Sequence, residues 1–119
     1  MDTKISNTIR QWIPDAYTLA GGNVEADGTL SDYQLLRNIS FSCLSKLDRA
    51  TAKDIDDVAR ILKVINLLYQ SDNQYIKHAI DNVFIKGIIT AQSTHNFERH
   101  LTIFPPALKR RYLKIIFNN

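Results

Sequence analysis

The fold is decided by residues 51–90, which read TAKDIDDVARILKVINLLYQSDNQYIKHAIDNVFIKGIIT. Apolar residues recur at spacings of three and four over 55–69 and again over 76–88, with a short polar break between the two runs. This period is typical of amphipathic helices rather than strands. Two helices with so short a connection pack antiparallel. The stretch therefore predicts a helical hairpin whose core contains Leu62, Ile65, Val83 and Phe84.

Capping residues mark where these helices begin. Thr51 with Asp54, and Ser31 with Gln34 upstream, have the spacing of a capping box, in which each side chain satisfies an amide at the helix start. We interpret the acidic cluster Asp54, Asp56 and Asp57 as charge that complements the helix dipole. Gly87 costs roughly 1 kcal/mol against alanine inside a helix, so it predicts a close approach by a neighbouring helix.

The flanking segments continue the helical pattern. Residues 3–20 predict a helix that Pro14 either kinks or restarts, with Ile5, Ile9, Trp12 and Ile13 at helical spacing. Residues 31–50 predict a helix with this apolar side: Tyr33, Leu36, Ile39, Cys43, Leu44 and Leu47. Pro105 or Pro106 should begin a last helix with Tyr112 on its inner face. The polar stretch 21–30 predicts a surface loop, interpreted as a plain connector, with a functional loop as the alternative.

Length and composition favour one compact domain. The chain has 119 residues, 45% of them hydrophobic and 23% charged, which suits a globular protein. Four glycines and three prolines are too few for a many-turned β-sandwich. We therefore predict a single all-α domain over residues 1–119, with five or six helices packed around an antiparallel helical hairpin. The single cysteine, and the lack of a leader or a long apolar run, predict a cytoplasmic protein with no membrane partner.

Motifs that carry chemistry are missing from the sequence. His78, His95 and His100 have no metal-ligand spacing, and no phosphate-binding glycine loop or nucleophile elbow occurs. Cys43 is interpreted as a small buried side chain. We therefore expect no catalytic residue, no cofactor and no metal, and we expect that the protein is not an enzyme.

Positive charge gathers near the C-terminus. Residues 76–119 carry a net charge of +5, whereas residues 1–75 carry −2. The sharpest feature is a set of four basic residues in the last predicted helix: Lys109, Arg110, Arg111 and Lys114. They form a candidate contact for an acidic partner surface or for phosphate, and the alternative is a solvated outer helix face.

Two segments suggest a relationship. The segment Ala79–Ile85, AIDNVFI, followed after a polar break by Phe104–Leu108, FPPAL, resembles an uncharacterised family of small bacterial helical proteins. The likeness covers about residues 50–119. It implies an all-helical fold and a role similar to that of immunity proteins encoded near polymorphic toxins, and it brings no catalytic residue.

Together these observations predict a non-enzymatic protein-binding module, and in particular an immunity-like protein that blocks a bacterial toxin. Its partner would be another protein, met by a helical face. The alternative is a nucleic-acid or acidic-ligand binder that uses the basic C-terminal helix. A net charge of only +3 disfavours this alternative.

Overall fold

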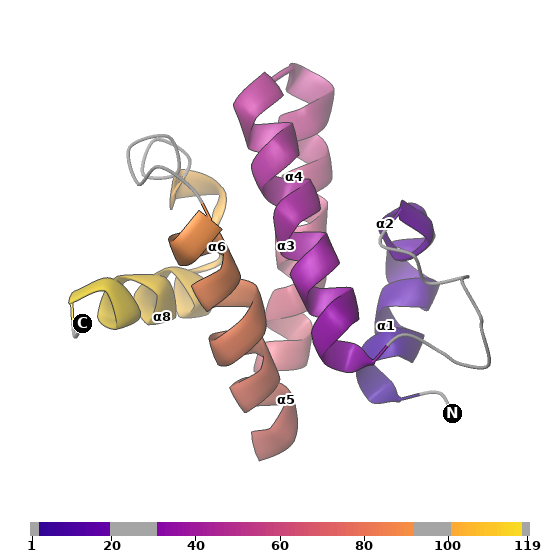
Figure 1. Cartoon of the computed structure of the whole chain (residues 1–119), viewed down its shortest axis with the longest axis vertical. Coiled ribbons are helices and arrows are strands. Elements are labelled where there is room, and N and C mark those ends of the chain that lie inside the picture. The colour runs from indigo at the N-terminus through magenta and orange to yellow at the C-terminus, as the bar shows by residue number, and fades with distance from the viewer. Residues whose placement is uncertain (1–2, 20–30, 92–100, 118–119) are drawn as a thin grey trace.

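Two long antiparallel helices form the centre of the molecule (Figure 1). The computed structural model describes residues 3–19, 31–91 and 101–117. α3 (Asp32–Arg49) and α4 (Ala52–Tyr69) lie side by side, and α3 also contacts every helical segment before it and the long helix after α4. The central hairpin is therefore α3–α4, whereas residues 74–91, predicted to form the hairpin with α4, pack mainly against α3.

The remaining helices flank this pair. On one side lie α1 (Lys4–Trp12) and α2 (Pro14–Leu19). On the other side, α5 (Gln74–Ala79) continues through a π-helical turn, η1 (Ile80–Ile85), into α6 (Lys86–Ala91). The 3₁₀ turn η2 (Leu101–Ile103) leads to α8 (Pro106–Phe117), which lies crosswise to α5 and α6 in Figure 1. Every regular element of the described residues is helical, which confirms a single all-α domain.

The helix starts follow the local chemistry of the sequence. Ser31 Oγ accepts a hydrogen bond from the Gln34 amide at 3.1 Å, which confirms the predicted capping box. The box at the start of α4 is confirmed by the same contact between Thr51 Oγ1 and the Asp54 amide, also 3.1 Å. Pro14 is the first residue of α2, so it begins a second helix rather than kinking the first. A proline is tolerated there because its missing amide would have no partner.

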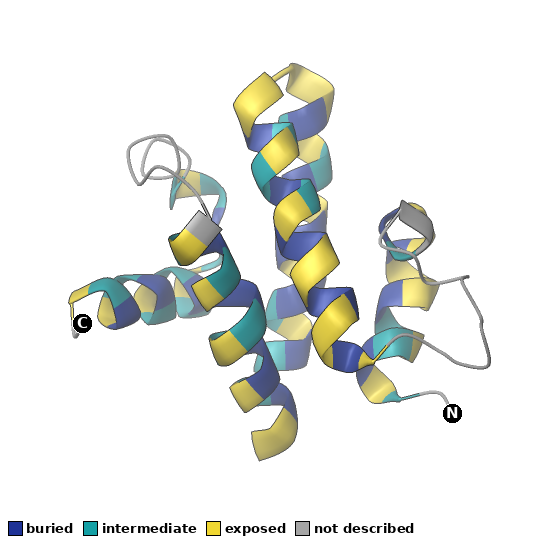
Figure 2. Ribbon diagram, viewed as in Figure 1, coloured by how far each residue is buried: buried dark blue, intermediate teal, exposed yellow. Residues whose placement is uncertain are grey.

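The core lies where the flanking helices meet α3 and α4 (Figure 2). Leu62, Ile65 and Phe84 are fully buried, as predicted, and Tyr112 brings the inner face of α8 into contact with Phe104 at 5.8 Å between ring centroids. A Cβ on Gly87 would lie 2.9 Å from Ser40 Oγ on α3. This contact confirms the close helix approach that the glycine predicted.

Three aromatic or apolar positions differ from their predicted places. Trp12 is 59% exposed, because the chain turns at Ile13, which takes the inner position between α1 and α2. Tyr33 is 46% exposed, because Asp32 occupies the inward position at the start of α3. Val83 is only partly buried, because the π turn brings Ile85 into the core beside Phe84.

A buried carboxylate explains the place of Tyr33. Asp32 accepts hydrogen bonds from Thr3 Oγ1 at 2.6 Å and from Tyr75 Oη at 3.0 Å, so it connects the starts of α1, α3 and α5. The Tyr75 ring then stacks on Tyr33, with centroids 6.4 Å apart. These two hydrogen bonds offset part of the cost of burying the carboxylate.

Membrane crossing has no support in the described part of the chain. None of its helices combines the length and the apolar character that a bilayer span requires.

Candidate functional site

The four basic residues of α8 do not form one open patch. Arg110 and Lys114 are exposed, while Lys109 is half-buried. Arg111 turns inward, and its Nε lies 3.0 Å from Asp81 Oδ1 on η1. Arg110 and Lys114 are therefore accessible to a partner, whereas Arg111 joins α8 to the π turn through its ion pair with Asp81.

The Asp81–Arg111 pair lies in a partly buried, polar setting. The side-chain contact with Asp81 raises the pKa of Arg111. Burial and, next, the charge of Asp81 raise the pKa of Tyr69 on α4 above its usual value. Both groups thus keep their protons at neutral pH, and the carboxylate of Asp81 is balanced by its neighbours.

The π turn positions the residues around this pair. An α-helix with one extra residue in a turn changes the direction of the side chains that follow, and such turns often lie at functional sites. Here η1 directs Asp81 toward Arg111 and leaves Asn82 exposed on the outside. Ile80, Phe84 and Ile85 remain in the core. The turn therefore combines a buried anchor with an exposed polar side chain.

Two surface hollows meet at the π turn. One, of about 290 Å³, lies between η1 and α8 and is lined by His78, Asp81, Asn82, Lys86, Arg111, Lys114 and Ile115. The other, of about 340 Å³, lies between α3 and α6 and is lined by Arg37, Phe41, Asn82, Val83, Lys86, Gly87 and Thr90. Asn82 and Lys86 border both. We call the surface formed by these exposed residues the π-turn face: Arg37, Phe41, His78, Asn82, Lys86 and Lys114.

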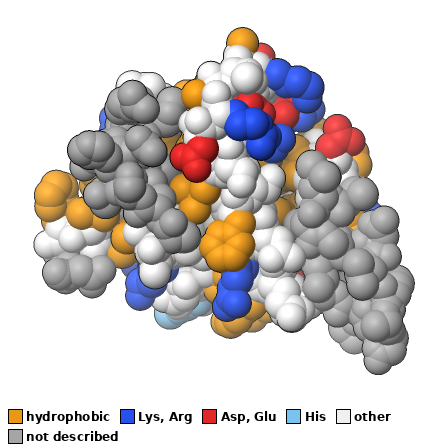
Figure 3. Space-filling view, turned by 45° about the horizontal axis from the view of Figure 1, so that its top comes forward, with side chains coloured by type: hydrophobic (Ala, Val, Ile, Leu, Met, Phe, Trp, Pro, Cys, Tyr) orange, Lys and Arg blue, Asp and Glu red, His pale blue; other side chains and the backbone are white. Residues whose placement is uncertain are grey.

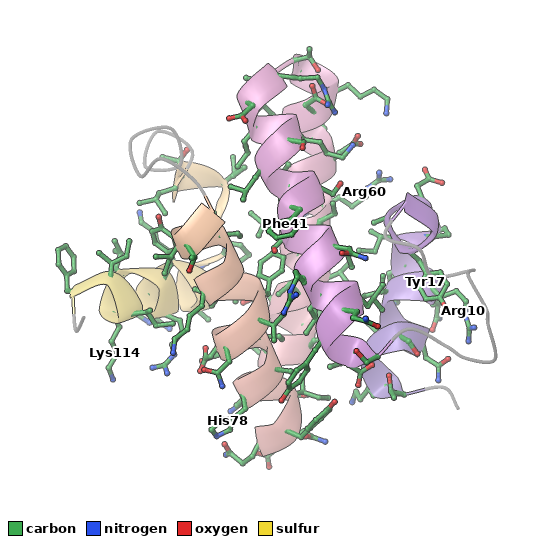
Figure 4. The ribbon with its side chains drawn as sticks, viewed as in Figure 1. Arg10, Tyr17, Phe41, Arg60, His78 and Lys114 are labelled. Carbon is green, nitrogen blue, oxygen red and sulfur yellow. The ribbon has the colours of Figure 1, made fainter. Side chains whose placement is uncertain are left out.

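An exposed aromatic ring lies on this basic surface. Phe41 is 45% exposed, and it lines the same hollow as Arg37 and Lys86. Figure 4 shows Phe41 over the junction of α3 with the π-turn helix, and Lys114 pointing away from α8. Figure 3 shows hydrophobic and basic side chains next to each other on this side of the molecule. The acid in the lining, Asp81, is neutralised by Arg111, so the π-turn face is positive with an apolar centre.

A family model described as a domain of unknown function (DUF7674) matches residues 6–119. The chain belongs to the DUF7674 family. No curated protein and no solved structure matches it.

The DUF7674 match confirms that the chain is a member of an uncharacterised family, and it extends well beyond the predicted 50–119. It includes both segments that suggested the relationship. In this DUF7674 chain the first segment, Ala79–Ile85, coincides with the π turn, and the second, Phe104–Leu108, leads into α8. The first segment supplies Asp81, Asn82 and Val83 to the lining of the two hollows, whereas the second lines a separate hollow beside Lys63.

Other predicted groups lie apart from the π-turn face or outside the described residues. Cys43 is buried, and burial raises its pKa to about 12, as suits a small core side chain. His78 is exposed at the edge of the face, whereas His95, His100 and the loop 21–30 lie outside the described residues. Within the described part, no group of three or more His, Cys, Asp or Glu side chains is placed to hold a metal ion.

Sequence reasoning found part of this site and missed the rest. It singled out Arg111 and Lys114, but not Arg37, Phe41 or Lys86, which come from helices far away in the chain. One signal was available for Phe41, because this large apolar residue falls outside the predicted apolar side of its helix. Gly87 was the second signal, since it predicted the close contact that brings the helices of Phe41 and Lys86 together.

Proposed function

We propose that this DUF7674 chain is a non-enzymatic protein-binding module that docks an acidic partner segment on the π-turn face. The observation that carries the proposal is Phe41, 45% exposed where it borders a hollow with Arg37 and Lys86. Protein interfaces are enriched in aromatic side chains and arginine at their centre. An apolar partner side chain would pack on Phe41, and acidic side chains would pair with the surrounding cations.

The shape and charge of the face support a protein partner. The hollows of about 290 and 340 Å³ can each receive one or two side chains. The exposed cations Arg37, Lys86 and Lys114 come from three different helices. Because these helices pack on the core, the backbone positions of the three cations are set before binding, and only their side chains lose freedom on docking.

The non-enzymatic part of the proposal is supported by the state of the one cysteine. Cys43 is buried, and its pKa of about 12 keeps the thiol protonated at neutral pH. A nucleophilic cysteine needs the thiolate form. Asp81 is likewise occupied by Arg111 and Tyr69, so it is poorly suited to act as a general base.

An immunity-like protein of a bacterial toxin system is the specific form of module that we propose. Its support is the resemblance carried by the segments 79–85 and 104–108, the first of which contributes Asn82 to the π-turn face. The mechanism would be steric occlusion, in which the face covers the active site of the toxin. Inhibitors of nucleic-acid-cleaving toxins are commonly acidic, whereas this face is positive, so the proposal favours a toxin that does not cleave nucleic acid.

A nucleic-acid binder is the second candidate, and Phe41 is the observation in its favour. An exposed aromatic ring beside cations can stack on an unpaired base. The charge is modest, however, because Arg111 is paired with Asp81. Each phosphate contact would add about one unit to the slope of log affinity against log salt concentration. The two candidates therefore differ clearly in how steeply their affinity falls with salt.

Co-expression tests the proposed function. The chain would be produced together with each protein encoded next to its own gene, and complexes would be identified by size-exclusion chromatography. We expect one stable complex, which Phe41→Ala should weaken by roughly tenfold or more, as at interface centres. In parallel, the chain would be titrated with a fluorescent 20-nucleotide thymidine strand in low and physiological salt.

The outcomes separate the candidates. A complex that Phe41→Ala leaves unchanged would remove the π-turn face from the proposal. Salt-sensitive binding to the thymidine strand below about 1 µM at physiological salt, tighter than the usual non-specific level, would replace the protein-binding function by the nucleic-acid one. For the immunity-like form, the chain should restore growth to cells that produce the neighbouring protein, and absence of rescue would contradict it.

A further inference from the structure

A second charged site lies on the other side of the α3–α4 pair, and it shares no residue with the π-turn face. Its centre is Asp57 on α4, which contacts three basic side chains. Asp57 Oδ2 lies 3.2 Å from Lys46 Nζ and 3.4 Å from Lys53 Nζ, and Oδ1 lies 3.2 Å from Arg60 Nη2. Three cations therefore gather around one carboxylate.

The three cations differ sharply in exposure. The Lys46 side chain is only 14% exposed, and Asp57 itself is 15% exposed, so these two form an inner pair. The side chains of Lys53 and Arg60 are 84% and 56% exposed. Burial alone would raise the pKa of Asp57, but hydrogen bonds from Lys46 and Lys53 outweigh it and lower that pKa. Lys46 can thus balance Asp57 while the two outer cations retain donors for another anion.

A hollow of about 360 Å³ opens beside these charges. It lies between α2, α3 and α4 and is lined by Ile13, Asp15, Ala16, Lys46, Lys53, Asp57, Arg60 and Ile61. Figure 4 shows Arg60 pointing from α4 toward α2, across this region. Ile13, Ala16 and Ile61 line the hollow with apolar side chains, although each exposes only a small part of its surface, at most 9%. The hollow therefore has an apolar wall and a charged rim, the usual combination in small-ligand sites of this size.

We propose that this hollow binds a small organic monocarboxylate with an apolar body. The carboxylate accepts hydrogen bonds from Lys53 and Arg60, and the apolar body packs against Ile13, Ala16 and Ile61. Lys46 stays on Asp57 and keeps that carboxylate from repelling the ligand. Asp15, exposed at the rim, disfavours a ligand with a second negative charge.

The preference for one negative charge follows from the balance of the lining. Lys46, Lys53 and Arg60 supply three positive charges, and Asp15 and Asp57 supply two negative ones. One bound carboxylate makes the site neutral. A dianion such as hydrogen phosphate would leave an excess negative charge and would have no apolar part to place against the isoleucines.

Methyl-detected NMR titration of the full chain tests this site with defined probes: 4-phenylbutyrate, its uncharged amide, and inorganic phosphate. We expect saturable shifts of the Ile13 and Ile61 methyl signals with 4-phenylbutyrate. The amide should bind about tenfold more weakly, because it lacks the charge-assisted hydrogen bonds. Phosphate should produce no saturable shift of these methyl groups.

Variants at the rim locate the carboxylate. Lys53→Gln together with Arg60→Gln should weaken 4-phenylbutyrate about tenfold or more, and both side chains are exposed enough for the fold to persist. Lys63→Gln is the matched control, because Lys63 is exposed on α4 and lines a different hollow, beside Pro105. It should change the affinity less than about twofold.

Three results would overturn the proposal. The first is absence of saturable Ile13 and Ile61 shifts with 4-phenylbutyrate, and the second is equal binding of the acid and its amide. The third is a rim variant that binds like the Lys63→Gln control. If the double variant were unfolded, the single variant Arg60→Gln would be measured instead, with an expected loss of about threefold. An unchanged affinity there would count against the site in the same way.

Discussion

α4 is a regular helix, whereas the helix that follows it is interrupted by a π-helical turn. α4 is an uninterrupted helix of 18 residues, whereas the next helix is divided into α5, η1 and α6, of six residues each. The regular helix has its central acid, Asp57, surrounded by intramolecular partners. The irregular one exposes Asn82 and Lys86 between two hollows. The comparison teaches that the interrupted helix exposes polar side chains between two hollows, whereas the regular helix gathers cations around one acid.

The largest expected effect comes from removing a core ring at the π turn. Phe84→Ala should lower the free energy of unfolding by about 3–5 kcal/mol, because it leaves a cavity in a fully packed site. Leu62→Ala on α4 is the matched change in the regular helix, with an expected loss of about 2–5 kcal/mol. Both side chains are 0% exposed. Urea unfolding monitored by circular dichroism measures the two losses.

If Phe84→Ala cost less than about 1 kcal/mol, far below the range for buried aromatic residues, the π turn would not hold this ring in the core. The interrupted helix would then not be packed on the core as the comparison with α4 assumes. A loss of about 3–5 kcal/mol, the range for a buried aromatic ring, would show that the irregular helix holds Phe84 in a packed site.

A smaller effect is expected from breaking the ion pair that joins η1 to α8. Asp81→Ala leaves Arg111 without its partner at 3.0 Å, and it should cost about 1–2 kcal/mol, since the pair is only partly buried. Asp56→Ala, at an exposed position on α4, is the control and should stay within about 0.5 kcal/mol of the wild type. Equal losses in the two variants, measured by chemical unfolding, would mean that the pair does not stabilise the π-turn face.

The smallest effect concerns the contact between α6 and α3. Gly87→Ala should destabilise by about 1 kcal/mol, because the new Cβ would meet Ser40 Oγ at 2.9 Å. In a Ser40→Ala background the obstacle is gone, and the same change should instead stabilise by up to about 1 kcal/mol through helix propensity. A double-mutant cycle in urea measures this reversal, and additive effects would contradict the close approach.

The sequence predicted what local chemistry determines. The capping boxes at Ser31 and Thr51 involve neighbours in the chain, and an interruption at Pro14, predicted as either a kink or a restart, follows from its missing amide. The apolar period of α4 could likewise be read directly, because nothing interrupts it. These features need no knowledge of which helices meet.

Features that depend on contacts between helices distant in the chain could not be predicted from the sequence. The π turn has no local signature in Ile80–Ile85, and it places Val83 partly outside the core while Ile85 enters. Tyr33 is outside because Asp32 bonds to Thr3 and Tyr75, residues from two other helices. The same reason explains the candidate site, since Phe41, Lys86 and Lys114 meet only after three helices have packed.

The central claim is that the π-turn face binds an acidic protein partner, and one measurement tests it most directly. Isothermal titration calorimetry would compare the affinity of the wild type, Lys86→Glu and Lys63→Glu for the protein with which the chain co-purifies. We predict that Lys86→Glu weakens binding about tenfold or more, because it reverses a charge that borders both hollows. Lys63→Glu, with the same change of charge on another surface, should remain within about twofold of the wild type. Equal affinities of the two variants would contradict the claim.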